Sequence, residues 1–208
     1  MNPLQGTDYW HKARYGLITA SRASDLMAKG KSGPSASRAN YLTELAIARL
    51  TEQPIQSFTT AAMQRGLDME PFACSAYEAR IGMLVEQSGF VKHPDVPYAG
   101  CSPDALVGDD GLAEFKCPDA MARHYEALLR GAHAVTYQWQ VQFQMWVMGR
   151  AWCDVVSYDP RFPEGLQLAI KRVERNDESI ENLAAECEKA DREICEMVEK
   201  LKQMKGAA

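Results

Sequence analysis

The stretch Cys101-Ser-Pro-Asp-Ala-Leu-Val-Gly-Asp-Asp-Gly-Leu-Ala-Glu-Phe-Lys-Cys-Pro118 decides the fold, because it has the pattern of one β-hairpin. A Gly-Asp-Asp-Gly turn signal separates an apolar run over residues 105–107 from a second run over residues 112–117, so the two runs should pair as antiparallel strands. Alternation along the second strand places Glu114 and Lys116 on the same face. Charged side chains in an apolar strand are costly to bury unless each has a partner of opposite charge or binds a metal.

The chemistry that these charges fit is hydrolysis of a phosphodiester. Burial is tolerable if a divalent cation neutralises the carboxylates of Asp104 and Glu114, and if the ammonium of Lys116 meets an anion. The main-chain carbonyl of Phe115 lies between the two charged residues of the strand, and hard cations accept such an oxygen as a ligand. The hairpin therefore predicts a metal-dependent phosphodiesterase in which Asp104, Glu114 and this carbonyl bind the cation and Lys116 orients the attacking water.

A site with two cations needs a further carboxylate from outside the hairpin. A helix predicted over residues 60–81 supplies Glu70 as the leading candidate and Glu78 as the reserve. A structural interpretation stays open beside this one. In that interpretation Asp104 closes a turn after Pro103, the two charges of the second strand form a surface ion pair on an edge strand, and Glu70 is a solvated helix residue.

The length and composition predict a single soluble domain. The chain has 208 residues, of which 46% are hydrophobic and 25% charged, which is enough for one core and short for two. No apolar stretch approaches the roughly 20 residues of a membrane span, and the first residues lack the pattern of a signal peptide. We therefore expect residues 1–208 to form one cytoplasmic domain that makes no membrane contact.

Six cysteines occur without any Cys-x-x-Cys pair, so we expect reduced thiols. This spacing also argues against an iron–sulfur cluster. One alternative metal site remains, built from His93, Cys101, Cys117 and His124, although single scattered ligands are weak support for it.

The formal net charge of −5 does not point to a nucleic-acid binder, but its distribution is uneven. Residues 1–50 are rich in Lys and Arg, whereas residues 174–200 are rich in Glu and Asp. This asymmetry predicts a basic face that holds a polyanion and an acidic face that meets solvent, although solvated helix faces would give the same count.

Hydrophobic periodicity predicts a mixed β-sheet flanked by helices, in the α/β (α+β) class. Residues 10–27 show helical spacing with a break at Gly16 and a cap at Thr19 or Ser21, and residues 29–34 read as a basic loop. Besides the helix over residues 60–81, we expect helices over residues 37–50, 120–129, 137–148 and 177–204, and strands over residues 84–91, 151–158 and 166–173 beside the hairpin.

Three blocks of the sequence resemble one known family. Residues 101–118 are similar to the Ser-Pro-Asp-Gly…Glu-hydrophobic-Lys-Cys-Pro motif of the phage lambda exonuclease family (YqaJ-type, alkaline exonuclease), which has a restriction-endonuclease-like core. Ala105 stands where that motif has its glycine. Trp10-His-Lys-Ala-Arg14 with Ile18-Thr-Ala-Ser21 resembles the N-terminal block of the family, and Gln140-Val-Gln-Phe-Gln-Met-Trp146 with Tyr158-Asp-Pro-Arg161 resembles a later one. The likeness spans residues 10 to about 175, which we take as the core, and the C-terminal helix matches least well.

The resemblance implies a role for each site residue. Asp104 and Glu114 would bind two Mg²⁺ ions, with Mn²⁺ as a substitute. Lys116 would position the nucleophile, and Glu70 and Gln140 would complete the catalytic site. The resemblance also implies a pocket for a 5′-phosphate, which suits bidentate arginine and neutral hydroxyl donors. The pocket residues would be Arg14, Ser21, Thr19 and Arg123, and the place of Arg123 depends on where a short gap falls between Lys116 and Gln140.

The implied activity is that of a 5′→3′ exonuclease on double-stranded DNA ends, which releases 5′-mononucleotides and leaves a 3′ single-stranded overhang. The resemblance further implies a ring-shaped homotrimer, a single-strand annealing protein as partner in recombination, and a phage or prophage source in a bacterial host. Two alternatives stay open: a structure-selective or nicking DNA endonuclease on the same fold, and a DNA-end-binding protein without turnover.

Overall fold

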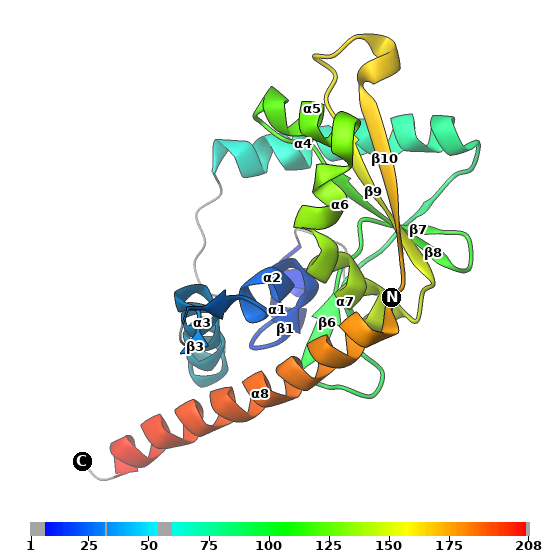
Figure 1. Ribbon diagram of the computed structural model, residues 1–208. Helices are drawn as coiled ribbons and strands as arrows, with labels where there is room; N and C mark the ends of the chain where they lie inside the picture. The colour runs from blue at the N-terminus through cyan, green and yellow to red at the C-terminus, as the bar shows by residue number, and fades with distance from the viewer. Residues whose placement is uncertain (1–6, 32, 54–59, 207–208) are drawn as a thin grey trace.

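The structure is a computed structural model that describes residues 7–31, 33–53 and 60–206 (Figure 1). Its centre is a five-stranded mixed sheet in the order β10, β9, β8, β7, β4. β9 and β8 are parallel, and the other neighbours are antiparallel. The strands are β4 (Glu86–Gln87), β7 (Ala105–Val107), β8 (Gly111–Lys116), β9 (Trp152–Tyr158) and β10 (Leu168–Glu174).

The predicted hairpin is confirmed. β7 and β8 pair in antiparallel register, with Ala105 opposite Ala113 and Val107 opposite Gly111. The turn needs glycine at Gly108, whose φ is +55°, and a Cβ on Gly111 would lie 2.2 Å from the indole of Trp152. β8 runs between β7 and β9, so the interpretation of the hairpin as a surface edge strand is wrong.

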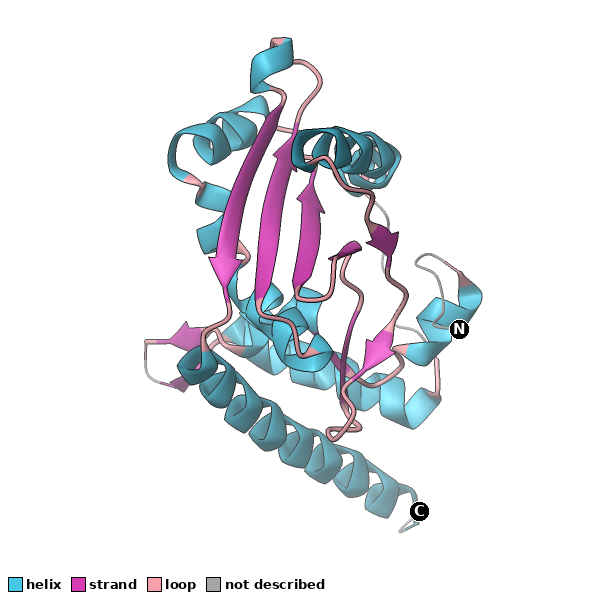
Figure 2. Cartoon of the chain, turned by 90° about the vertical axis from the view of Figure 1, so that its right-hand side faces the viewer, coloured by secondary structure: helices cyan, strands magenta, loops and turns pink. Residues whose placement is uncertain are grey.

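Helices cover both faces of this sheet (Figure 2). One face packs against α4 (Ala61–Ile81) through Ala73 and Tyr77, whereas the other face packs against α6 (Ala132–Thr136) and α7 (Gln138–Met148). Because side chains alternate along β8, Phe115 faces α4 while Leu112 and Glu114 face α7.

A second group of elements packs below the sheet around one hydrophobic cluster. A small sheet has the order β1, β6, β5, with β1 parallel to β6. Leu45 of α3 and Leu183, Cys187 and Ile194 of α8 lie in the cluster with Phe143 of α7. The elements are α1 (Asp8–Ala13), β1 (Ile18–Thr19), α2 (Ala23–Leu26), α3 (Ala36–Thr51), β5 (Val91–Lys92), β6 (Ala99–Cys101) and α8 (Asp177–Gly206).

The prediction of separate basic and acidic faces needs correction for two of its arginines, because α3 lies against α8 (Figure 1). Arg38 is 4% exposed and binds Glu186 at 2.6 Å and Glu193 at 2.8 Å. Arg49 binds Asp191 at 2.7 Å. The acidic C-terminal helix therefore neutralises arginines of the basic N-terminal segment instead of facing away from them.

The predicted helices over residues 37–50, 60–81, 120–129, 137–148 and 177–204 are present, as are strands over most of residues 151–158 and 166–173. Three predictions need correction. Residues 10–27 contain two short helices and the 3-10 turn η1 (Ala20–Arg22), and Thr19 precedes this turn without a side-chain capping bond. The strand predicted over residues 84–91 is reduced to β4 and the start of β5. The basic loop contains a small hairpin of two strands with two residues each, β2 (Lys29–Gly30) and β3 (Gly33–Pro34). Residue 32 lies outside the described residues.

All six cysteines are free thiols, as predicted. The alternative site of His93, Cys101, Cys117 and His124 is wrong, because within residues 7–31, 33–53 and 60–206 no three His, Cys, Asp or Glu side chains are arranged to hold a metal. His124 instead uses both ring nitrogens within the fold, towards Ser157 Oγ and the carbonyl of Leu166. In the described part of the chain, no helix is long and apolar enough to cross a membrane.

Candidate active site

Glu114 is the centre of a buried polar cluster at the end of β8. Its side chain is 5% exposed. Oε1 accepts hydrogen bonds from Lys116 Nζ and Gln140 Nε2, each at 2.6 Å, and Oε2 accepts one from Gln144 Nε2 at 2.6 Å. The two glutamines stand one helical turn apart on α7, so the same face of this helix reaches both carboxylate oxygens.

Lys116 belongs to the cluster, and its ammonium group lies over an aromatic ring. Its Nζ is 3.4 Å from Gln140 Oε1 and 4.2 Å from the centroid of the Tyr137 ring. Burial alone would lower the pKa of Lys116, but the carboxylates of Glu114 and Asp104 outweigh burial and raise it. The lysine is therefore a permanent cation at the site.

Asp104 and Glu70 bring further negative charge to the cluster. Asp104 Oδ2 accepts the main-chain N–H of Phe115 at 2.7 Å, which ties Asp104 to β8. Burial, reinforced by the charges of Glu114 and Glu70, raises the pKa of Asp104 well above its ordinary value. Burial, reinforced by the charge of Glu114, also raises the pKa of Glu70. The reserve candidate Glu78 lies elsewhere on α4, where its Oε1 accepts the main-chain N–H of Val85.

This donor set fits a hard divalent cation. Asp104 and Glu70 are partly buried, and their raised pKa values reflect burial and repulsion from Glu114, which a cation between the carboxylates would relieve. Every donor is an oxygen, as Mg²⁺ and Mn²⁺ prefer. Magnesium sites commonly complete their coordination with water and substrate phosphate. In the described residues, no three His, Cys, Asp or Glu side chains stand together as a ready-made metal site.

The structure also brings together three of the four residues predicted for the phosphate pocket. Arg14 NH2 donates to Ser21 Oγ at 3.3 Å, and Ser21 Oγ lies 3.5 Å from Thr19 Oγ1. Burial lowers the pKa of Arg14, and its guanidinium stacks 3.9 Å from the centroid of the Trp10 ring. The Nε1–H of Trp10 donates to Ser102 Oγ at 2.8 Å. The arginine pocket is thereby linked to the chain two residues before Asp104.

The fourth residue, Arg123, is placed apart from this group. It is exposed on α5 (Met121–Arg130), and its charge acts on His133. Among the described residues, no hydrogen bond or ion pair joins Arg123 to Arg14, Thr19 or Ser21.

Sequence reasoning missed three residues that contact the predicted ones: Trp10, Tyr137 and Gln144. Gln144 carried a readable signal, because it follows Gln140 by four positions in a predicted helix and so shares its face. Trp10 also stood four positions before Arg14, on which it stacks, whereas its bond to Ser102 and the contact of Tyr137 with Lys116 join segments far apart in the chain.

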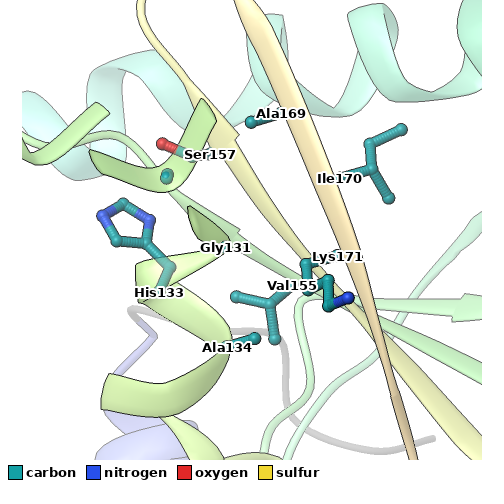
Figure 3. A pocket seen from close by; sticks show the side chains of 9 residues that line it. Gly131, His133, Ala134, Val155, Ser157, Ala169, Ile170 and Lys171 are labelled. Atoms are coloured by element: carbon teal, nitrogen blue, oxygen red, sulfur yellow. The ribbon is translucent and has the colours of Figure 1, made fainter. Parts of the chain in front are cut away.

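A cavity of about 10 Å³ lies between α6 and strands β9 and β10, which is room for one water molecule (Figure 3). His133 and Ser157 line it, and His133 Nδ1 is buried without a hydrogen-bond partner in the described part of the chain. Burial, together with the charge of Lys116, lowers the pKa of His133 to about 4. His133 is therefore a neutral imidazole near the cluster at neutral pH.

The chain is similar to several solved structures. One is an alkaline exonuclease (LHK-Exo) from Laribacter hongkongensis, with 40% identity and a TM-score of 0.89 over 97% of this chain and 99% of that chain. The same enzyme in complex with dAMP gives 41% identity, a TM-score of 0.89 and the same coverage. A phage-related exonuclease from Haemophilus somnus, at 13% identity, shares the fold with a TM-score of 0.73 over 89% of this chain and 96% of that chain. No curated protein matches the chain.

Fold and site together define an α/β nuclease that acts on DNA. The family described as YqaJ-like viral recombinase domain matches residues 9–151. The chain belongs to this family, as its sequence motifs predicted.

Proposed function

We propose that this chain is a divalent-cation-dependent exonuclease that degrades the 5′ strand from the ends of double-stranded DNA. Its products would be 5′-mononucleotides and a 3′ single-stranded overhang. The observation that carries the proposal is the cluster of Asp104 and Lys116 around the buried carboxylate of Glu114, linked through Trp10 and Ser102 to Arg14. The similar enzyme LHK-Exo, solved in complex with dAMP, supports the same class of product.

In the mechanism, Asp104, Glu114, Glu70 and the carbonyl of Phe115 would hold Mg²⁺, with two ions as the expected number and Mn²⁺ as a substitute. When bound, the cation supplies a Lewis acid that activates water and stabilises charge on the phosphate. Lys116 orients the attacking water and offsets negative charge at the reacting phosphate, since its raised pKa keeps it protonated. Gln140 keeps Glu114 and Lys116 in place by contacting both.

The pocket of Arg14, Thr19 and Ser21 would hold the terminal 5′-phosphate. An arginine binds phosphate through two parallel hydrogen bonds, and neighbouring hydroxyls add neutral donors. Because the pocket is tied to the chain leading into Asp104, a seated end would place the first phosphodiester at the acidic cluster. This arrangement favours exonuclease action over internal cutting.

The test uses linear duplex DNA with 5′-phosphate or 5′-hydroxyl ends, closed circular DNA, Mg²⁺ or Mn²⁺, and Lys116→Ala as the control. Degradation of phosphorylated linear DNA that is lost in the variant is the expected result. Cutting of closed circles would replace the proposal with an endonuclease. Binding to ends without cleavage in either metal would replace it with an end-binding protein.

We further propose that the enzyme works as a homotrimeric ring and passes its overhang to a single-strand annealing protein. A ring would explain how a chain of net charge −5 stays on DNA, because enclosure adds to the electrostatic attraction of its basic residues. Light scattering with and without DNA tests this proposal, and a monomer in both conditions would contradict it.

A further inference from the structure

Gln144 has a buried side-chain amide of which only the nitrogen makes a hydrogen bond with a described residue. The side chain has no solvent exposure, and its Nε2 donates to Glu114 Oε2 at 2.6 Å. Its Oε1 is buried and accepts no hydrogen bond from any described residue. A buried acceptor without a donor destabilises the fold, so a packing role alone does not account for a glutamine here.

The neighbouring Gln142 shows what a purely structural glutamine looks like on this helix. It is 1% exposed, its Nε2 donates to the carbonyl of Glu174 at 2.8 Å, and its Oε1 accepts the N–H of Asn176 at 2.9 Å. Both ends of Gln142 are used to join α7 to the end of β10 and the link that follows it before α8. Gln144, in contrast, donates its hydrogen bond to the carboxylate at the centre of the candidate site.

The two carboxylate oxygens of Glu114 accept different numbers of hydrogen bonds. A carboxylate oxygen offers two lone-pair sites. Oε1 accepts two donors, Lys116 Nζ and Gln140 Nε2, so both of its sites are taken. Among the described residues, Oε2 accepts a hydrogen bond from Gln144 Nε2 alone, which leaves the second site on this oxygen without a described donor.

We propose that Gln144 is a positioning residue of the cation site. It holds Glu114 so that Oε2 alone is available to a divalent cation, which makes Glu114 a ligand through one oxygen. The proposal rests on the proposed function, since it needs a cation at this cluster.

The test measures Mn²⁺ binding by titration calorimetry without DNA, in the wild type, in Gln144→Met and in the matched control Gln142→Met. Residues that orient a metal ligand typically change metal affinity 10–100-fold, and we expect a Kd increase of about 10-fold or more in Gln144→Met. The control loses buried hydrogen bonds on the same helix, so it should lower Tm and leave the Mn²⁺ Kd unchanged. Turnover should show a lower kcat at limiting Mn²⁺ with an unchanged KM for DNA.

Gln144→Asn gives a second variant, because it keeps the amide but is one methylene too short to reach Glu114. It should weaken Mn²⁺ binding as Gln144→Met does. An unchanged Mn²⁺ Kd in folded Gln144 variants, or an equal rise in the Gln142 control, overturns the positioning role while the proposed function stands. A wild type that binds no Mn²⁺ overturns the proposed function, and the positioning role with it.

Discussion

At the scale of single residues, an ionised Asp104 destabilises the folded state, and a bound cation would offset this effect. Its ionised form is disfavoured by burial and by the charges of Glu114 and Glu70, so its pKa is raised. Active sites commonly trade stability for function in this way. We expect Asp104→Asn to abolish cleavage and yet to raise Tm in the absence of divalent cations, by roughly 2–4 °C if the gain is about 1 kcal/mol.

The difference in Tm between Asp104→Asn and the wild type should depend on pH. An acid whose pKa is raised by folding resists ionisation in the folded state, so the wild type loses stability as pH rises from about 4 through the raised pKa. The gain in Tm of Asp104→Asn should therefore be small in acid and grow with pH. Calorimetric scans in chelator across this range check it, and a variant less stable than the wild type at alkaline pH would contradict the repulsion.

Arg14 offers a second test at this scale. If its guanidinium binds the terminal phosphate, Arg14→Gln should lower the rate ratio between 5′-phosphate and 5′-hydroxyl ends by about 10-fold or more, since a hydrogen bond to a charged group contributes roughly 1.5–3 kcal/mol. The measurement is initial rates on the two substrates. Arg192→Gln on the exposed surface of α8 removes the same charge and should leave the ratio unchanged. A ratio that falls equally in both variants would reveal only a loss of general attraction to DNA.

At the scale of elements, α3 and α8 are joined by Arg38, which reaches Glu186 and Glu193 from an almost fully buried position. Removing one partner of a buried pair costs about 3–5 kcal/mol, and the partial exposure of the two glutamates reduces this figure. We expect Arg38→Met to destabilise the chain by about 2 kcal/mol in urea unfolding. Arg192→Met breaks an exposed pair with Glu188 and should cost less than about 0.5 kcal/mol, so equal effects would refute a special role for the buried arginine.

The same elements show what a sequence can predict and why the rest escapes. The helices over residues 37–50, 60–81 and 177–204 were predictable because each repeats apolar residues at spacings of three and four over many turns. β4 and β5 were merged into one strand because each has two residues, and only their partners β7 and β6 separate them. α6 has five residues after Gly131, too few for a periodic signal, and was missed.

In the candidate site, too, local patterns were predictable and contacts between distant segments were not. Asp104, Glu114 and Lys116 could be read from one hairpin, because strand alternation and a tight turn fix their relative positions. Glu70 was a candidate from its predicted helix, and the family resemblance was needed to favour it over a solvated helix residue. The pairing of acidic α8 with Arg38 and Arg49 escaped altogether, since a count of charges does not say which helices touch.

At the scale of the whole molecule, the candidate cation site joins elements that are far apart in the chain. Glu70 belongs to α4, Asp104 leads into β7, Glu114 lies on β8, and α7 holds Glu114 from the other side. A ligand that binds only the folded state stabilises it by RT ln(1 + [L]/Kd), which is about 2.7 kcal/mol at 100 times Kd. We therefore expect saturating Mn²⁺ to raise Tm by about 5–10 °C, and a chelator to reverse the rise.

This stabilisation should depend on pH, because a cation binds the ionised carboxylates and their raised pKa values make ionisation harder in acid. As pH falls through these raised pKa values, protons compete with the cation, so the Mn²⁺-induced shift in Tm should be smaller at about pH 5.5 than at about pH 8. Thermal scans of the whole chain with Mn²⁺ or chelator at both pH values measure it, with Asp104→Asn as the control in which the shift is largely lost. A shift of equal size at both pH values, or one retained in Asp104→Asn, would place the bound ion away from this cluster.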